Sequence, residues 1–311
     1  VIWVLPGKHA NRARIAHERF NHVPYDELLR WKKNGMAGMD FTMAEWRAAK
    51  ASICGSCAVG KMRKKPRNRE RTTPKATRAF GRIFVDLFFM GEKDREGRSI
   101  GMFILDEATA CEWVKCLRHK NEALNAFIQW TNAARRGFGI SEVVLPFRQP
   151  RPIGYVRTDN GGEFGPRWVE YVRAMGATPE RSTPIEGHVF PAERGIQTLK
   201  ADIRCLLATS GLSHLFWCDA AAARCFVRNR LPRDRLNNKS PFTRLTGEEP
   251  DLSAIRIFGA PCIVHIPASK RTGLENTAIK GQLIGYGAFL REYRVYCPDT
   301  NRIYRRQSVI F

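Results

Sequence analysis

The sequence predicts a mixed α/β protein built in three successive parts, and three observations lead to that prediction. The first third is polar and basic with short helical stretches. The middle changes to three apolar runs of strand character, followed by alternating helices and strands, and the tail is a series of short β-rich runs. Adjacent strands followed by alternating helices and strands are typical of a layered α/β fold. A length of 311 residues accommodates two or three domains.

The N-terminal third is expected to be a small helical module followed by a basic linker. Residues 25–34 and 43–51 place apolar side chains at helical spacing. Residues 61–78, KMRKKPRNRERTTPKATR, hold nine Lys or Arg among eighteen residues and almost no apolar side chains. Such a segment cannot bury a core, so it is expected to be a linker or arm. The predicted parts are therefore a module at 1–60 and a linker at 61–78.

The central part, predicted to form one α/β domain over residues 79–250, contains both strand and helix patterns. Apolar runs bounded by turn residues predict strands at 82–89, 100–105, 111–117, 154–158 and 177–181. Helical periodicity predicts helices at 122–136, 166–175, 192–209 and 214–229.

The tail has a different pattern, in which short β-rich runs follow one another between Pro, Gly and Asn-Thr turns. These runs lie at 255–259, 262–266, 281–287, 293–297 and 302–311. Five short strands at this spacing predict a small β-barrel over residues 251–311.

The strongest signal in the composition is a formal net charge of +22, with a pI near 10.1. Self-repulsion of this size destabilises a compact chain unless a polyanion neutralises it. Nucleic acid is the expected partner, because phosphate contacts and counterion release dominate such binding. An anionic membrane surface is the alternative, although no basic amphipathic helix stands out. We expect no membrane-spanning helix, since no run of about 18 apolar residues occurs, and the missing initiator Met suggests a segment of a longer chain.

Two pairs of metal-ligand residues occur in the N-terminal module. Four residues separate His17 from His22, and two separate Cys54 from Cys57. Two imidazoles and two thiolates at these spacings can converge on a tetrahedral Zn²⁺. Four protein ligands leave no open position, so the ion would be structural and would contribute to folding. The alternative is that these are ordinary cysteines and surface histidines.

Two aspartates occupy positions that are typical of a metal site in an α/β domain. Asp86 lies inside an apolar run, where a carboxylate is costly to bury unless a cation compensates it. Asp159 ends a predicted strand and begins the turn Asp-Asn-Gly-Gly, where backbone can approach a ligand closely. The alternatives are a hydrogen-bonded structural Asp86 and a turn without further function at Asp159.

A third acid, Glu193, lies 34 positions after Asp159 in the first turn of a long predicted helix. Alone, it could serve only to complement the helix dipole. Together, the three acids could hold two divalent ions for an in-line phosphoryl displacement, and hard oxygen ligands favour Mg²⁺ or Mn²⁺. The helix face below Glu193 carries Gln197, Lys200 and Arg204.

These last three side chains are candidate DNA contacts, with a solvated polar face as the alternative. Lys64 and Lys65 of the basic linker are further candidates for DNA binding.

The motifs occur in a fixed order along the chain, namely HERFNH at 17–22, CGSC at 54–57, FVDLFF at 84–89, RTDNGGEF at 157–164 and AERGIQTLKADIR at 192–204. In this order they resemble copia-type retrotransposon integrases, within the wider group of retroviral integrases and DDE transposases. The later stretch LPRDRLNNKSPFTRLTGEEPDLSAIRIFGAPCIVHIP resembles the same polyproteins beyond the core. The resemblance covers nearly the whole chain.

The resemblance implies a zinc-binding helical N-terminal domain, an RNase H-like core and an SH3-like β-barrel. It implies an integrase that joins the 3′-OH ends of element DNA into target DNA with Mg²⁺ or Mn²⁺. Asp86, Asp159 and Glu193 match the catalytic triad, and Lys200 matches a position that contacts element-end DNA. His17, His22, Cys54 and Cys57 match the zinc ligands.

The partners implied by the resemblance are double-stranded DNA from the element ends and the target, further copies of the chain, and a reverse transcriptase and protease linked in the same polyprotein. No membrane partner is expected. Action in the nucleus, after a stage in a cytoplasmic particle, is implied as well.

The chain departs from the family pattern in two places. The loop before the glutamate usually reads Pro-Gln-Gln-Asn-Gly-Val-Ala-Glu, whereas residues 186–193 read EGHVFPAE, and residues 141–152 look like an insertion. Two other functions therefore stay open beside the integrase. One is a catalytically inactive nucleic-acid-binding remnant of a retrotransposon polyprotein, and the other is a different metal nuclease on an RNase H-like core.

Overall fold

The structure is a computed structural model that describes residues 11–61, 74–135, 152–181, 191–267, 271–272, 274, 276–287 and 292–311. The chain divides into two compact units that alternate along the sequence. One comprises Val1–Met62, Asp202–Val227 and Asp251–Phe311, and the other comprises Arg63–Ala201 and Arg228–Pro250. Within the described ranges, no helix has the length and apolar content needed to cross a membrane.

The N-terminal part contains four short helices, α1 (Arg12–Arg19), α2 (Tyr25–Lys33), α3 (Met43–Ala51) and α4 (Gly55–Gly60). The side chain of Asn11 accepts a hydrogen bond from the first turn of α1. Thr42 and Glu45 form a reciprocal capping box at the start of α3, which satisfies amide groups that have no partner inside the helix. The helices predicted at 25–34 and 43–51 are confirmed, while α1 and α4 were not predicted individually.

A five-stranded mixed sheet forms the centre of the second unit. Its strands are β1 (Arg82–Phe89), β2 (Ile100–Asp106), β3 (Glu112–Leu117), β4 (Tyr155–Thr158) and β5 (Thr178–Arg181), in the order β3-β2-β1-β4-β5. The strands β1, β2 and β3 pair antiparallel, and β4 pairs parallel to both β1 and β5. The five strands predicted for this region are confirmed.

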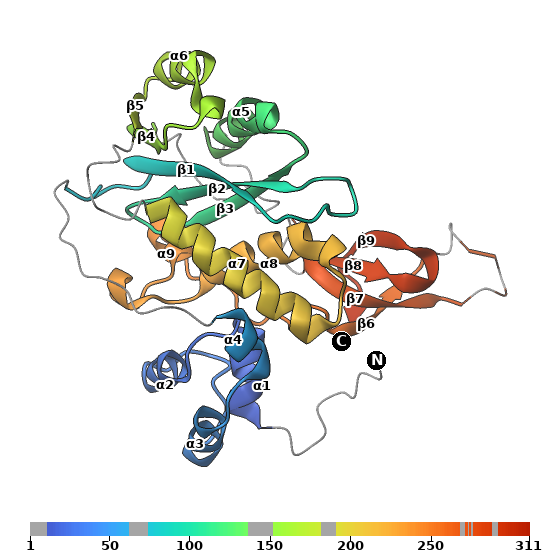
Figure 1. Ribbon diagram of the computed structural model, residues 1–311. Coiled ribbons are helices and arrows are strands. Elements are labelled where there is room, and N and C mark those ends of the chain that lie inside the picture. The colour runs from blue at the N-terminus through green and yellow to red at the C-terminus, as the bar shows by residue number, and fades with distance from the viewer. Residues whose placement is uncertain are drawn as a thin grey trace. The chain divides into compact units, whose positions relative to one another are not determined.

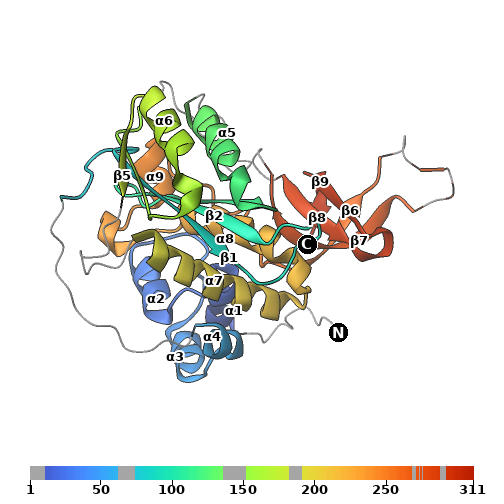
Figure 2. The same cartoon turned by 45° about the horizontal axis from the view of Figure 1, so that its top comes forward.

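Helices α5 (Ala123–Arg135) and α6 (Pro166–Ala174) lie side by side over one face of this sheet (Figures 1 and 2). The rings of Phe127 and Trp168 stack with their centroids 4.5 Å apart, which joins the two helices. Trp130 is fully buried and its ring lies 5.3 Å from that of Trp113 in β3. Burial of these large apolar surfaces stabilises the contact between helices and sheet.

The remaining helices are α7 (Pro191–Ser210), α8 (Trp217–Arg230) and α9 (Pro241–Thr246), with five short 3-10 turns among the described residues at Lys120–Glu122, Gly162–Phe164, His214–Phe216, Asp234–Leu236 and Pro298–Thr300. One side of α7 faces the core, where Ile196, Leu199, Ile203 and Leu206 are all buried.

The C-terminal part forms a second five-stranded sheet, visible at the right of Figure 1. Its strands are β6 (Pro261–His265), β7 (Ala278–Tyr286), β8 (Tyr293–Cys297), β9 (Arg302–Arg306) and β10 (Val309–Ile310), in the order β10-β6-β7-β8-β9. All pairs of neighbouring strands are antiparallel.

The strand predicted at 255–259 is wrong, and the run predicted at 302–311 contains two strands instead of one. Residues 255–259 have turn hydrogen bonds, such as that from the Ala260 amide to the Ile257 carbonyl. The hydroxyl of Tyr286 also bonds to the amide and carbonyl of Arg256. The apolar side chains Ile255 and Phe258 are nevertheless buried. The apolar pattern at 255–259 therefore indicated buried side chains correctly, but not a paired strand.

The packing around Trp130 leads to a stability prediction. We expect Trp130→Ala to lower the free energy of unfolding by about 3–5 kcal/mol, because a large cavity would form between α5 and the sheet. Urea denaturation followed by circular dichroism measures this loss. As a control, Leu215→Ala at a side chain that is 48% exposed should change stability by less than about 0.5 kcal/mol. Equal effects of the two substitutions would contradict the packing described.

Candidate functional site

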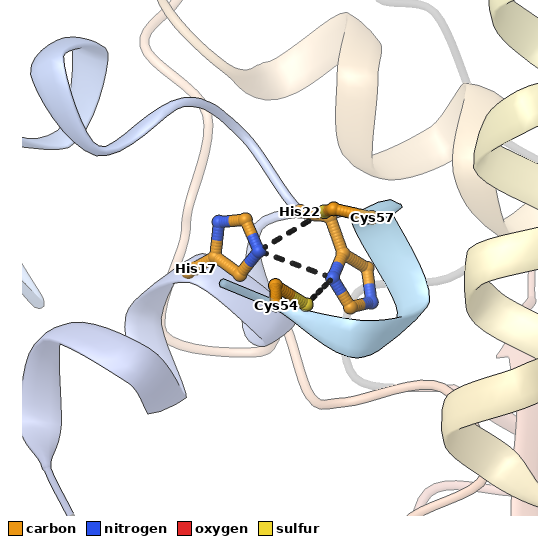
Figure 3. Close-up of side chains that lie close together, drawn as sticks. All are labelled: His17, His22, Cys54 and Cys57. Carbon is orange, nitrogen blue, oxygen red and sulfur yellow. Dashed lines mark hydrogen bonds between the residues drawn. The ribbon is translucent and has the colours of Figure 1, made fainter. Parts of the chain in front are cut away.

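The two predicted pairs of metal-ligand residues come together in the structure. One ligand atom from each of His17, His22, Cys54 and Cys57 lies within 4.8 Å of the others, and all but Cys57 are buried (Figure 3). His17 lies on α1, and His22 follows in a turn with a left-handed backbone. Cys54 caps α4 and Cys57 lies inside that helix. This cluster could hold a metal ion.

The hydrogen bonds of the two imidazoles determine which ring nitrogens face the cluster. His17 Nδ1 lies 2.7 Å from the Val23 carbonyl oxygen, and His22 Nε2 lies 3.1 Å from Thr209 Oγ1. The other nitrogens, His17 Nε2 and His22 Nδ1, are 3.2 Å apart. Each also approaches a thiol, with 3.5 Å between His22 Nδ1 and Cys54 Sγ and 3.3 Å between His17 Nε2 and Cys57 Sγ.

The surroundings of the cluster alter its proton affinities. Burial, followed by the nearby charge of His17, lowers the pKa of His22 to about 3. A hydrogen bond to Cys205, followed by burial, raises the pKa of Cys57 to about 12, and burial raises the pKa of Cys54. In the metal-free protein His22 is therefore neutral and ready to bind a cation, whereas a metal ion must displace protons from the thiols.

The predicted acids Asp86 and Asp159 are brought to neighbouring positions by the parallel pairing of β1 and β4. The recorded partners end at Phe84 and Arg157, which differ by 73 positions. Asp86 and Asp159 differ by the same 73 positions, so the same register places them opposite one another just beyond the end of the ladder. Asp86 is half-buried, as is Asp159.

Glu193 approaches the same place from the first turn of α7. Asp86 is paired across the sheet with Phe103 of β2. The ring of Phe103 lies so close to Gly195 that a Cβ atom there would be 2.5 Å from it. The glycine thus allows the start of α7 to lie directly on the strand that neighbours Asp86, and Glu193 precedes it by two residues.

The electrostatics of Asp86 are consistent with this convergence. Burial, followed by the like charge of Asp159 and then of Glu193 and Glu163, raises the pKa of Asp86 to about 7. Like charges at close range disfavour ionisation of a partly buried carboxyl group. Within the described part of the chain, however, the only ligand atoms placed tightly enough to share one ion belong to the His/Cys cluster.

Glu163 is a residue near this site that sequence reasoning missed, although it lies in the motif around Asp159. Its carboxylate and that of Asp159 both contact Gly161, where a Cβ atom would be 2.8 Å from Glu163 and 3.0 Å from Asp159 Oδ1. Lys120 lies 3.8 Å from Glu163. Gly161 also donates its amide to Asp159 Oδ1 over 3.0 Å. The glycine in this motif therefore allows two carboxylates to approach the same turn.

The candidate DNA contacts have different surroundings. Gln197 donates weakly to Glu193 over 3.5 Å and is exposed. Lys200 Nζ lies 5.8 Å from the centre of the Phe88 ring, and Arg204 donates to the Gly60 carbonyl oxygen. Lys64 and Lys65 lie outside the described residues, as do residues 182–190 of the loop before Glu193.

The low pKa of His22 predicts how the metal-free protein responds to acid. Because the folded state keeps His22 neutral and the unfolded chain binds a proton below pH 6.5, its contribution to stability is complete above pH 6.5 and is lost as pH falls toward about 3. We expect the melting temperature, measured with a chelator present, to fall between pH 7 and pH 5. His22→Gln should reduce this dependence, and an unchanged slope in that variant would contradict the assignment.

Comparison with known proteins relates this chain to the polyproteins of retroviruses and retrotransposons. Residues 260–311 match the family described as the retroviral polymerase SH3-like domain. The chain is 28% identical over 217 residues to a retrovirus-related Pol polyprotein from transposon TNT 1-94 of Nicotiana tabacum, covering 69% of this chain and 16% of that protein. It is 26% identical over 259 residues to the corresponding polyprotein of transposon RE1 of Arabidopsis thaliana, covering 83% of this chain and 17% of that protein.

A structural comparison gives a weaker result. A chain of the simian T-cell lymphotropic virus intasome in complex with PP2A regulatory subunit B56 gamma matches with 12% identity and a TM-score of 0.48, covering 94% of this chain and 95% of that one. Likeness at this level does not by itself establish a common fold.

The chain spans about one sixth of the length of the curated relatives it matches. The described structure is a mixed α/β protein with two sheets, and the second sheet lies within the matched SH3-like domain. The resemblance predicted from the ordered motifs is confirmed: this chain is related to the Pol polyproteins of copia-type retrotransposons.

Proposed function

We propose that this chain is the integrase region of a retrotransposon Pol polyprotein and joins element DNA ends to target DNA. The observation that carries the proposal is the convergence of Asp86, Asp159 and Glu193. Burial of Asp86, followed by the like charge of the other two acids, raises its pKa to about 7. The sheet order β3-β2-β1-β4-β5, with one antiparallel half and one parallel half, supports an RNase H-like core.

The three acids are suited to hold divalent cations. Each offers hard oxygen ligands, and their mutual repulsion would be relieved by positive charge between them. When bound, two such ions supply activation of an attacking hydroxyl and stabilisation of the leaving oxygen. The chain itself fixes Asp86 in a paired strand, holds Asp159 through the Gly161 amide, and presents Glu193 on a helix.

The His/Cys cluster fits a structural zinc ion. A tetrahedral ion with bonds of about 2.0 Å to nitrogen and 2.3 Å to sulfur places two nitrogens about 3.3 Å apart, and a nitrogen and a sulfur about 3.5 Å apart. The corresponding distances here are 3.2 Å for the nitrogens, and 3.5 and 3.3 Å for the two nitrogen–sulfur pairs. With four protein ligands the ion would stabilise the fold and take no part in the chemistry.

The proposed partners are double-stranded DNA and further copies of this chain, with a reverse transcriptase and protease in the same polyprotein. The net charge of +22 supports the first of these, since phosphate contacts dominate such affinity. Action in the nucleus belongs to the same proposal.

Strand transfer tests the proposed active site. We expect Asp159→Asn to abolish Mn²⁺-dependent joining of a labelled element-end duplex to a plasmid, because a required ligand is lost. Binding of the same duplex should stay within about twofold, because a single carboxylate does not carry phosphate contacts. Glu248→Gln, at an exposed side chain in the same unit, is the matched control and should join DNA normally. Binding without joining by the wild type would instead favour the inactive remnant.

Metal binding at the acids is expected to depend on pH. Below pH 7 a proton on Asp86 competes with the cation, so the apparent affinity for Mn²⁺ should rise by up to about tenfold per pH unit and level off above pH 7. Calorimetry in buffers of different ionisation enthalpy measures the protons released. Up to about one proton should be released at pH 6 and almost none at pH 8.5, and equal release at both values would contradict the role of Asp86.

A further inference from the structure

The C-terminal half of α7 contacts the segment that carries the His/Cys cluster. Lys61 donates to the backbone carbonyl of His22 over 2.8 Å and forms a 3.0 Å ion pair with Asp202 of α7. Arg204, which sequence reasoning placed among DNA contacts, donates to the Gly60 carbonyl over 2.9 Å. The contacts therefore reach both the end of α4 and the backbone of a candidate ligand.

Thr209 of α7 bonds directly to one of the four candidate ligands. Its hydroxyl oxygen lies 3.1 Å from His22 Nε2 and 3.1 Å from the hydroxyl of Ser56. His22 Nδ1 faces the cluster. When Nδ1 binds the proposed ion, Nε2 carries the ring proton and donates it to Thr209. Ser56 lies between Cys54 and Cys57 in the sequence, so the same threonine contacts both halves of the cluster.

Cys205 of α7 places a third sulfur beside the two thiols of the cluster. Its thiol donates to the Ser56 carbonyl oxygen over 3.0 Å. Ser56 directly precedes Cys57, so this bond holds the backbone from which the Cys57 side chain extends. Cys205 and Thr209 are four residues apart and therefore lie on the same face of the helix, together with Asp202.

We propose that Thr209 and Cys205 of α7 are positioning residues of the zinc centre, the first orienting the His22 imidazole and the second holding the backbone at Ser56, which directly precedes Cys57. Zinc binding by the N-terminal segment and ordering of the C-terminal half of α7 then stabilise each other. The inference rests on the zinc centre proposed above, and it does not depend on strand transfer.

The physical reason is that a ligand binds a metal strongly only when its ring or thiolate is already aimed at the ion. A hydrogen bond from the outer nitrogen of a histidine fixes the tautomer and the ring orientation, and loss of such a partner typically weakens metal binding about 10–100-fold. Coupling of this kind is reciprocal in free energy, so removal of the metal must also weaken the attachment of α7.

Zinc affinity of the full-length chain tests the proposal, measured by competition with the chromophoric chelator 4-(2-pyridylazo)resorcinol. We expect Thr209→Val to raise the dissociation constant about 10–100-fold. Thr209→Ser keeps the hydroxyl and should restore affinity to within about threefold of the wild type. Thr198→Val, the same substitution on the same helix at a hydroxyl that bonds to the Arg194 carbonyl, is the matched control and should leave the affinity unchanged.

Two further measurements do not depend on how well Thr209→Val folds. In the Co²⁺-loaded protein, Cys205→Ala should shift the thiolate-to-cobalt charge-transfer band, because it removes the hydrogen bond to the Ser56 carbonyl that fixes the backbone directly before Cys57. In the wild type, chelation of zinc should speed amide exchange at residues 202–210 and leave residues 123–130 of α5 unchanged.

The outcomes separate the two proposals. Suppose that the wild type binds one zinc ion per chain, that Thr209→Val binds zinc equally well, and that Cys205→Ala leaves the cobalt band unchanged. These results would overturn the role of α7 and leave the zinc centre intact. If the wild type binds no more zinc per chain than the Cys54→Ser variant does, both the zinc centre and the role of α7 would be overturned. Weakened binding in Thr209→Val with recovery in Thr209→Ser supports the inference.

Discussion

The like charge of Asp86, Asp159 and Glu193 is the constraint on which the α/β unit depends. Burial of Asp86, followed by repulsion from the other two carboxylates, raises its pKa to about 7. The three acids stay together because each belongs to a rigid element whose position is fixed elsewhere. The parallel pairing of β1 with β4 sets two of them, and close contact of Gly195 with Phe103 sets the third. The core beneath α5 and α6 supports this arrangement.

The His/Cys cluster shows the same principle with other chemistry. Two imidazole nitrogens lie close to two thiols, and each imidazole has a second contact that fixes its direction. For His17 that contact is the backbone carbonyl of Val23, but for His22 it is Thr209, far away in the sequence. A small module with few buried side chains gains stability from such a centre, because metal binding adds to the free energy of folding.

The way in which acidic side chains pair with arginines is relevant to the proposed binding of DNA. Several acids are used in buried or half-buried ion pairs, such as Glu112 with Arg233, Asp202 with Arg224, and Glu107 with Arg82. Those carboxylates neutralise arginines inside the protein and contribute little to its surface. Each such pair cancels in charge, so the net charge of +22 is carried by other basic residues of the chain, and those that are exposed can be reached by phosphate groups.

The sequence by itself predicted the five strands of the central sheet and the longer helices, and it named four metal-ligand residues and three acids as candidates. Periodicity and residue spacing are local properties, and they report local structure well. The strand predicted at 255–259 was wrong because an apolar pattern records burial, which a turn can also satisfy.

Only the tertiary structure decided which distant residues meet. It placed Glu163 beside Asp159, and Thr209 and Cys205 beside the His/Cys cluster. No local pattern marks Thr209 and Cys205, because their roles arise from contacts with a segment that lies far away in the chain. Glu163 is only four residues from Asp159, but the turn at Gly161 that brings the two carboxylates together is seen only in the structure.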